Sequence, residues 1–152
     1  MIVGSQVATH MKTETVLDAI EMARWSRGKH LPGLRCHSDA GSQFTSIRSG
    51  ERLAEIGAVP SIGSVGDSFD NALAETVNGY YKAELVRGPE HPGPWKTIEE
   101  LELATLGWVH WHNNERLHGF IGDVPPAEFE EIIYAETHQA QVLAENTTPG
   151  SP

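Results

Sequence analysis

Short apolar segments alternate with helix-forming segments through the first 86 residues of the chain. Three segments that are bounded by turn residues are typical of β-strands: 2–8 ("IVGSQVA"), 34–39 ("LRCHSD") and 58–63 ("AVPSIG"). Each is followed by a segment with helical spacing of its apolar residues, at about 13–27, 46–56 and 71–86. Because strands that alternate with helices pair in parallel, this order predicts an α/β layer structure.

The rest of the chain is expected to be helical. A proline-rich break at 87–95 precedes a helix from about Thr97 to Asn113, and a shorter helix is expected from Pro125 or Pro126 to about Tyr134. The final residues have the composition of a frayed tail.

Composition restricts the class of protein. No apolar run approaches the ~20 residues that cross a bilayer, and the N-terminus does not resemble a signal peptide. The single cysteine, Cys36, excludes an internal disulfide and is expected to be an inert buried thiol, so a reducing cytoplasm is the default location.

The net charge of −10 weighs against a nucleic-acid partner, but it is unevenly distributed. Residues 88–152 carry −9 of it, whereas residues 34–87 carry only −2. A nucleic-acid surface in the middle of the chain therefore remains compatible with the composition.

Asp39 ends a strand-like segment just before a glycine turn, and Glu75 lies in the second turn of the helix expected from 71. Ligands gather outside the carboxyl ends of strands in α/β sheets, and a helix laid across that edge would bring the two carboxylates together. Two adjacent carboxylates repel unless a cation lies between them, and hard oxygen ligands suit Mg²⁺ or Mn²⁺. On this geometry alone, an ordinary turn aspartate and a solvated helix glutamate explain the pattern better.

Several longer motifs favour the metal site over this ordinary explanation. They are "HSDAGSQF" (37–44), "GSVGDSFDNALAETVNGYYKAEL" (63–85) and "HWHNNERLHGFIGDVPPAEFE" (110–130). In this order they resemble the integrase core of bacterial insertion-sequence transposases, with the insertion-sequence-three family of the retroviral-integrase superfamily as the nearest match. The resemblance covers about residues 2–134.

The resemblance implies a ribonuclease H-like fold and an Asp-Asp-Glu triad that holds Mg²⁺ or Mn²⁺ for DNA cleavage and strand transfer, the chemistry of a polynucleotidyl transferase. Asp39 matches the second acid of that triad and Glu75 the third. Lys82 matches the basic residue that contacts the transposon end. Further DNA contacts are expected at Asn71, Asn78, Gln43 and Arg116. The implied partners are transposon-end and target DNA and further copies of the chain, in a bacterial cytoplasm and associated with the nucleoid.

The sequence departs from the family at its start. The family's first acid lies on a strand upstream of 2–8, and no Asp or Glu occurs before Glu14. We therefore expect a ribonuclease H-like fold that lacks its first strands and has a C-terminal helical extension. The corresponding division is 1–88 as a partial core, 89–138 as the C-terminal helical part and 139–152 as a flexible tail.

With two of three acids, the chain is expected to be inactive alone. A non-catalytic DNA-binding or oligomerising transposase remnant is the alternative, and an unrelated metal-dependent nuclease of the same fold is a weaker one. A zinc site at His110, His112 and His118 is disfavoured because alternate residues of a helix point to different sides.

Overall fold

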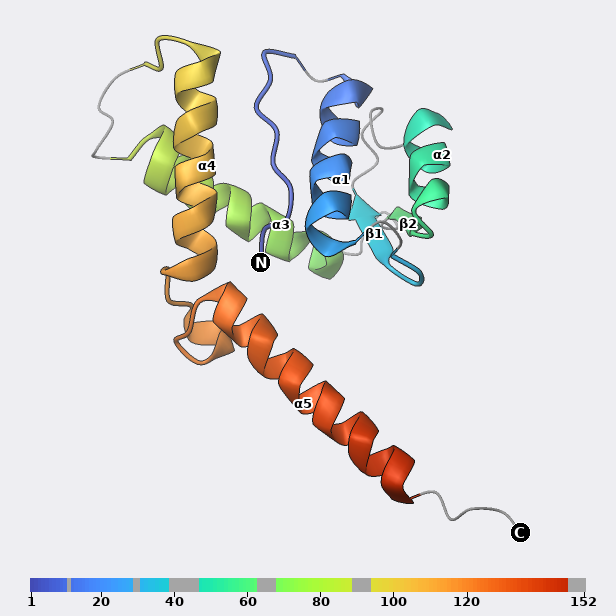
Figure 1. The fold of residues 1–152 in the computed structure, drawn as a ribbon. Helices are drawn as coiled ribbons and strands as arrows, with labels where there is room; N and C mark the ends of the chain where they lie inside the picture. The colour runs from blue at the N-terminus through green and yellow to red at the C-terminus, as the bar shows by residue number, and fades with distance from the viewer. Residues whose placement is uncertain (11, 29–30, 39–46, 63–67, 89–93, 148–152) are drawn as a thin grey trace. The chain divides into compact units, whose positions relative to one another are not determined.

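The computed structural model describes the whole chain except residues 11, 29–30, 39–46, 63–67, 89–93 and 148–152. The described residues form helices and a two-stranded sheet (Figure 1). In chain order the elements are α1 (Thr13–Arg27), β1 (Arg35–Ser38), α2 (Ile47–Glu55), β2 (Val59–Ile62), α3 (Ser68–Tyr81), the π-helix η1 (Lys82–Val86), α4 (Ile98–Asn114), the 3-10 helix η2 (Gly119–Ile121) and α5 (Pro126–Thr147).

The chain divides into two compact units, and the boundary falls within α4. One unit comprises residues 2–108 and the other residues 109–152 together with Met1. The predicted division at residue 88 stays a prediction.

The sheet pairs β1 with β2 in parallel, and α2 makes the crossover between them. The register runs from Arg35 opposite Val59 to Ser38 opposite Ile62. Parallel strands need a crossover of this kind, because a short hairpin can join only antiparallel strands. The expected α/β pattern with parallel pairing is confirmed for this part of the chain.

Residues 2–8, by contrast, form no strand, so that expectation is wrong. A strand exists only through hydrogen bonds to a neighbouring strand, and this segment lies against α1 instead. The Ser26 hydroxyl donates to the Val3 carbonyl at 3.2 Å. The backbone at Gly4 approaches α1 so closely that a Cβ there would lie 2.2 Å from the Ala19 carbonyl oxygen. Only glycine fits at this position.

The core of the β1–α2–β2 unit is small and apolar. Leu53 and Ile56 at the end of α2 and Ala58 before β2 are buried. Ile20 of α1 and Cys36 of β1 pack against this cluster. Burying a side chain such as leucine stabilises a fold by about 1.5–3 kcal/mol, so this contact helps to hold α1 and β1 to α2.

Gly57 lies one residue after the predicted helix end at 56 and ends α2. The Gly57 amide donates to the Ala54 carbonyl at 3.0 Å, and the Ala58 amide donates to the Leu53 carbonyl at 2.9 Å. These two bonds form a Schellman motif, whose C′ residue is left-handed, and Gly57 has a φ of 78°. Glycine adopts this conformation without a steric penalty.

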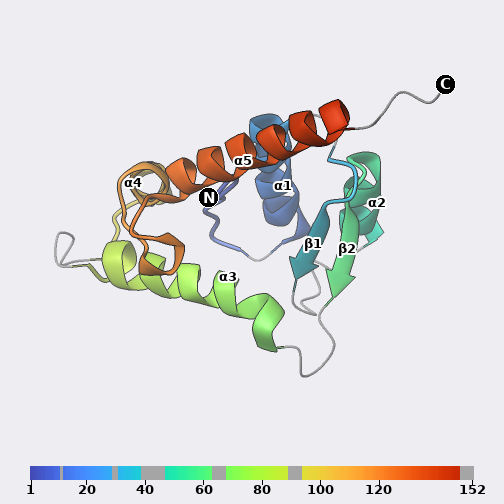
Figure 2. The same cartoon turned by 90° about the horizontal axis from the view of Figure 1, so that it is seen from below.

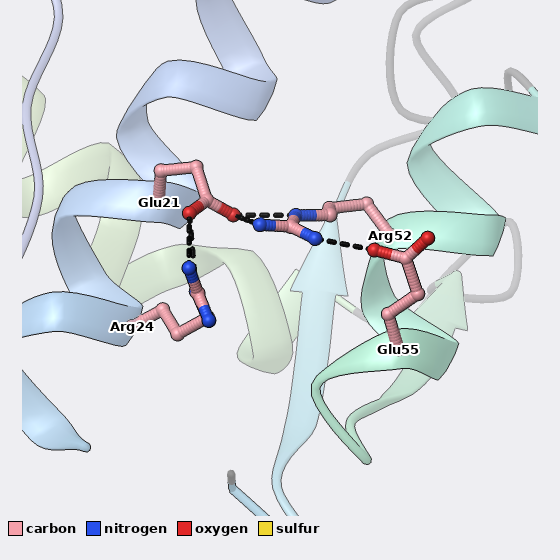
Figure 3. A network of polar contacts seen from close by, with 4 residues as sticks. All are labelled: Glu21, Arg24, Arg52 and Glu55. Atoms are coloured by element: carbon pink, nitrogen blue, oxygen red, sulfur yellow. Dashed lines mark hydrogen bonds and ion pairs between the residues drawn. The ribbon is translucent and has the colours of Figure 1, made fainter. Parts of the chain in front are cut away.

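Ion pairs join α1 to α2 beside this core (Figure 3). The guanidinium group of Arg52 on α2 binds Glu21 of α1 and Glu55 of its own helix. Arg24 contacts the other oxygen of Glu21 at 2.9 Å. Desolvation raises the pKa of Glu21, but the hydrogen bonds and charges of Arg52 and Arg24 outweigh it and leave that pKa lowered.

The helix that carries Glu75 differs from its predicted form at both ends. It begins at Ser68 instead of Asn71, and α-helical geometry stops at Tyr81. The π-helical turn η1 continues to Val86, with the Arg87 amide donating to the Lys82 carbonyl at 2.9 Å. Leu73 on this helix is 74% exposed.

Of the later helices, α4 matches its predicted bounds to within one residue and α5 is longer than predicted. Thr97 caps α4, its hydroxyl accepting the Glu100 amide at 3.1 Å. α5 begins at Pro126, as expected, but continues to Thr147 and so passes well beyond Tyr134. The described part of the predicted tail is therefore helical. No helix of the described residues is long and apolar enough to cross a membrane.

Candidate active site

The strand that leads to Asp39 is described, but Asp39 itself and Gln43 lie outside the described residues. β1 ends at Ser38, immediately before Asp39, and its parallel neighbour β2 ends at Ile62. The carboxyl ends of the two strands thus share one edge of the sheet, which is where ligands gather in α/β folds.

Glu75, Asn78 and Lys82 follow one another at helical spacing on α3 and the first residue of η1, and all three are exposed. Positions i, i+3 and i+7 lie on one face of a helix. Asn71 belongs to the same helix, but its side chain is not among those described. The structure therefore presents a polar stripe, Glu75–Asn78–Lys82, along one side of this helix.

α3 contacts β1, the strand that precedes Asp39. In Figure 2, α3 extends away from the edge of the sheet that is formed by the carboxyl ends of β1 and β2. This places the helix that carries Glu75 beside the strand that leads to Asp39. The approach of the two carboxylates to each other stays a prediction.

The donor chemistry of this pair fits a hard divalent cation. Both side chains offer carboxylate oxygens, and Glu75 is exposed on its helix. No cluster of three or more His, Cys, Asp or Glu side chains occurs among the described residues, which do not include Asp39. The role of Asp39 and Glu75 as metal ligands stays a prediction.

The C-terminal end of the Glu75 helix is fixed to α4 by contacts that the sequence did not reveal. The Trp108 indole N–H donates to Glu84 at 3.0 Å, and the Tyr81 ring meets the Trp108 ring edge-on with centroids 5.3 Å apart. The Tyr81 hydroxyl lies 2.8 Å from the Thr105 hydroxyl. A signal was present, because Tyr81 and Glu84 are three residues apart and so are Thr105 and Trp108, the spacing of facing pairs on two packed helices.

Arg116 lies in the unit of residues 109–152 and is half-buried there. Its guanidinium group lies 3.2 Å from His118 Nδ1 and stacks over Trp111 at 6.0 Å. Arg116 thus contacts residues of its own unit, and the DNA contact expected of Arg116 stays a prediction.

The histidines of this unit do not converge on one point. His112 is buried and meets the His118 ring edge-on at 4.7 Å, whereas the exposed His110 contacts Asn114. His110 and His112 thus point to different sides of α4, as helical geometry requires. A shared zinc site at the three histidines is not formed.

Cys36 is half-buried on β1, where its side chain packs against the small core. Burial raises the pKa of its thiol. Since the thiolate is the reactive form, this agrees with the inert cysteine that the sequence predicted.

Comparison with known proteins defines the class of this chain. A family model described as an integrase core domain matches residues 57–126, a range that contains Glu75 and Lys82. These residues are an integrase core domain, and the chain is similar to insertion-sequence transposases over most of its length. This domain implies a ribonuclease H-like fold, of which the described residues show the parallel strand pair and its helices.

Three of the similar proteins bear transposase names. The chain is 54% identical to a putative transposase for insertion sequence element IS986/IS6110 from Mycobacterium tuberculosis, over 89% of this chain and 49% of the relative. It is 49% identical to the transposase for insertion sequence element IS629 from Shigella sonnei, over 88% of this chain and 43% of the relative. The transposase for IS904 from Lactococcus lactis is 29% identical, over 86% of this chain and 50% of the relative. The chain spans about half the length of the curated relatives it matches.

Proposed function

We propose that this chain contributes the second and third acids of a transposase active site, which cleaves transposon-end DNA and joins it to target DNA. One observation supports this most directly: α3 exposes Glu75 and Lys82 on one stripe and contacts the strand that leads to Asp39. The similarity to proteins that are named as transposases supplies the reaction class.

Each group has a role that follows from its chemistry. Asp39 and Glu75 would hold the cation through carboxylate oxygens, and Mg²⁺ or Mn²⁺ would supply the Lewis acid that activates a water or a 3′-hydroxyl. Lys82, seven residues after Glu75, would bind a backbone phosphate near the reacting bond. Asn71, Asn78 and Gln43 would add neutral hydrogen bonds to the same strand, and Arg116 would be a further DNA contact.

The acid content of the chain limits what it does alone. Two carboxylates leave much of an octahedral Mg²⁺ shell to water, and no acid occurs before Glu14. We therefore propose that residues 1–152 bind DNA and a divalent ion weakly but do not cleave DNA by themselves, and that copies of the complete transposase act together as an oligomer.

Metal binding tests the assignment of Glu75 without requiring catalysis. Mn²⁺ added to the chain should broaden NMR signals near residue 75, and Glu75→Gln should weaken that effect several-fold. Glu51→Gln, at an exposed glutamate of α2, is the matched control and should leave it unchanged. Equal Mn²⁺ broadening in the Glu75→Gln protein would remove Glu75 from the site.

A cleavage assay tests the inactivity of the chain. Labelled transposon-end DNA incubated with Mg²⁺ and the purified chain should remain intact. Cleavage that Glu75→Gln abolishes would support the site but overturn the proposed inactivity.

A non-catalytic DNA-binding or oligomerising transposase remnant is the second candidate function. Retention of transposon-end DNA at low salt without a divalent ion, unchanged by Glu75→Gln, would favour it. Absence of DNA binding at low salt would count against both functions.

A further inference from the structure

Tyr81 and Glu84, which lie on either side of Lys82 in the sequence, form hydrogen bonds with residues of α4. The buried Trp108 donates its indole N–H to the Glu84 carboxylate at 3.0 Å, and indole can act only as a donor. The contact is therefore a charge-assisted hydrogen bond in a partly buried setting, which is stronger and more directional than a neutral one.

A second hydrogen bond holds Tyr81, the residue before Lys82, to Thr105 of α4. The buried Thr105 hydroxyl donates to the Leu101 carbonyl at 2.7 Å, so its proton is committed. The Tyr81 hydroxyl must then donate to Thr105 Oγ1 across their 2.8 Å contact. Tyr81 also meets the Trp108 ring edge-on, which couples the two bonds through one aromatic pair.

The backbone at this point has the π-helical geometry that is frequent at functional sites. Lys82 is the first residue of η1 and lies between Tyr81 and Glu84. The turn ends at Val86 with Arg87 as its C-cap, and the backbone at Gly88 lies so close to Glu84 that a Cβ there would be 1.9 Å from the Glu84 carbonyl oxygen.

We propose that Glu84 and Tyr81 are positioning residues. Their hydrogen bonds to Trp108 and Thr105 set the rotation of α3 about its own axis. Because Lys82 continues the stripe of Glu75, that rotation fixes the direction in which Lys82 meets a DNA phosphate. The inference rests on the proposed function, which makes Lys82 a phosphate contact.

A double-mutant cycle on DNA binding tests the positioning role. Transposon-end DNA is titrated with the full chain from about 50 to 200 mM salt, because each phosphate contact adds ~1 to the slope of log affinity against log salt. Lys82→Ala should lower that slope by about 1. Trp108→Phe, which keeps the ring but removes the N–H donor, should lower it by a similar amount. Lys82→Ala added to Trp108→Phe should change little further.

Two substitutions of Glu84 separate positioning from charge. Glu84→Gln and Glu84→Leu remove the same negative charge, but only glutamine keeps an oxygen that accepts the Trp108 N–H. Glu84→Gln should retain the wild-type salt slope and Glu84→Leu should lose about 1 from it. Identical slopes for the two variants would overturn the proposal.

The outcomes separate this inference from the proposed function. If Lys82→Ala leaves the salt slope unchanged, Lys82 is not a phosphate contact and the proposed function loses that residue. If Lys82→Ala lowers the slope equally in the wild type and in Trp108→Phe, the positioning role is overturned and the DNA contact stands. Circular dichroism checks folding, and Glu84→Leu replaces Trp108→Phe in the cycle if the latter does not fold.

Discussion

Arg52 of α2 binds the carboxylate of Glu21 on α1, 31 positions earlier in the chain, and so joins the two helices beside the small core. The pKa of Glu21 is held below its ordinary value of 4.5. A lowered pKa in the folded state contributes stability above the unfolded pKa, and that stability is lost as the pH falls through the lowered value.

Glu21→Gln should therefore flatten the acid side of the stability profile. The wild type should lose urea resistance as the pH falls below about 4.5, and the variant should lose less over that range because it has no carboxylate to protonate there. Urea midpoints at neutral pH and at two acidic values provide the measurement. Glu51→Gln, outside the network, should keep the wild-type pH dependence.

Leu53 should be among the most costly core positions to truncate. Leu53→Ala removes one of the few buried apolar side chains and should lower the free energy of unfolding by about 2–5 kcal/mol. Leu73→Ala makes the same chemical change at a side chain that is 74% exposed and should stay within about 0.5 kcal/mol. Similar urea midpoints for the two variants would contradict the core as described.

One glycine inside α2 and one just after it should respond to alanine with opposite signs. Gly57→Ala forces a side chain into the left-handed region and should cost about 1–2 kcal/mol. Gly50→Ala lies inside α2, where a Cβ meets no atom within 4 Å, and should stabilise the chain by about 0.5–1 kcal/mol. Thermal unfolding of both variants checks the contrast, and a shift of the same sign in both would count against the Schellman ending of α2.

Cys36 should react slowly with iodoacetamide in the folded protein. Burial raises the pKa of its thiol, so little thiolate is present at about pH 8. Mass spectrometry should show alkylation that is at least about tenfold faster in concentrated guanidinium chloride, where the thiol is exposed. Equal rates in the two conditions would show that the thiol is not protected.

The sequence predicted those elements whose signals are local. Gly57 marks the end of α2, and the alternation of apolar segments located β1, α2 and β2 to within a few residues. Residues 2–8 have strand composition but lie against α1, because composition does not say whether a partner strand is within reach. The contact of Glu84 with Trp108 was not predicted either, since it joins residues 24 positions apart.

The candidate site was recognised through its motifs and not through its geometry. The order of "HSDAGSQF" and the segment around Glu75 indicated the family, and the resemblance is confirmed by the similar proteins. The residues that hold α3 against α4 were missed, because tyrosine, glutamate and tryptophan at these positions also suit an ordinary helix surface. Sequence motifs reveal the residues that take part in the chemistry more readily than the residues that position them.

Pro60 determines at which edge of the sheet a further strand can pair. The Val59 amide donates to Leu34, so Val59 faces β1 and the next residue, Pro60, faces the opposite edge of β2. Proline has no N–H to offer a strand that approaches from that side, whereas β1 contains no proline. Enlargement of this sheet, whether by folding with another segment or by unwanted self-association, is therefore favoured at β1 and obstructed at β2.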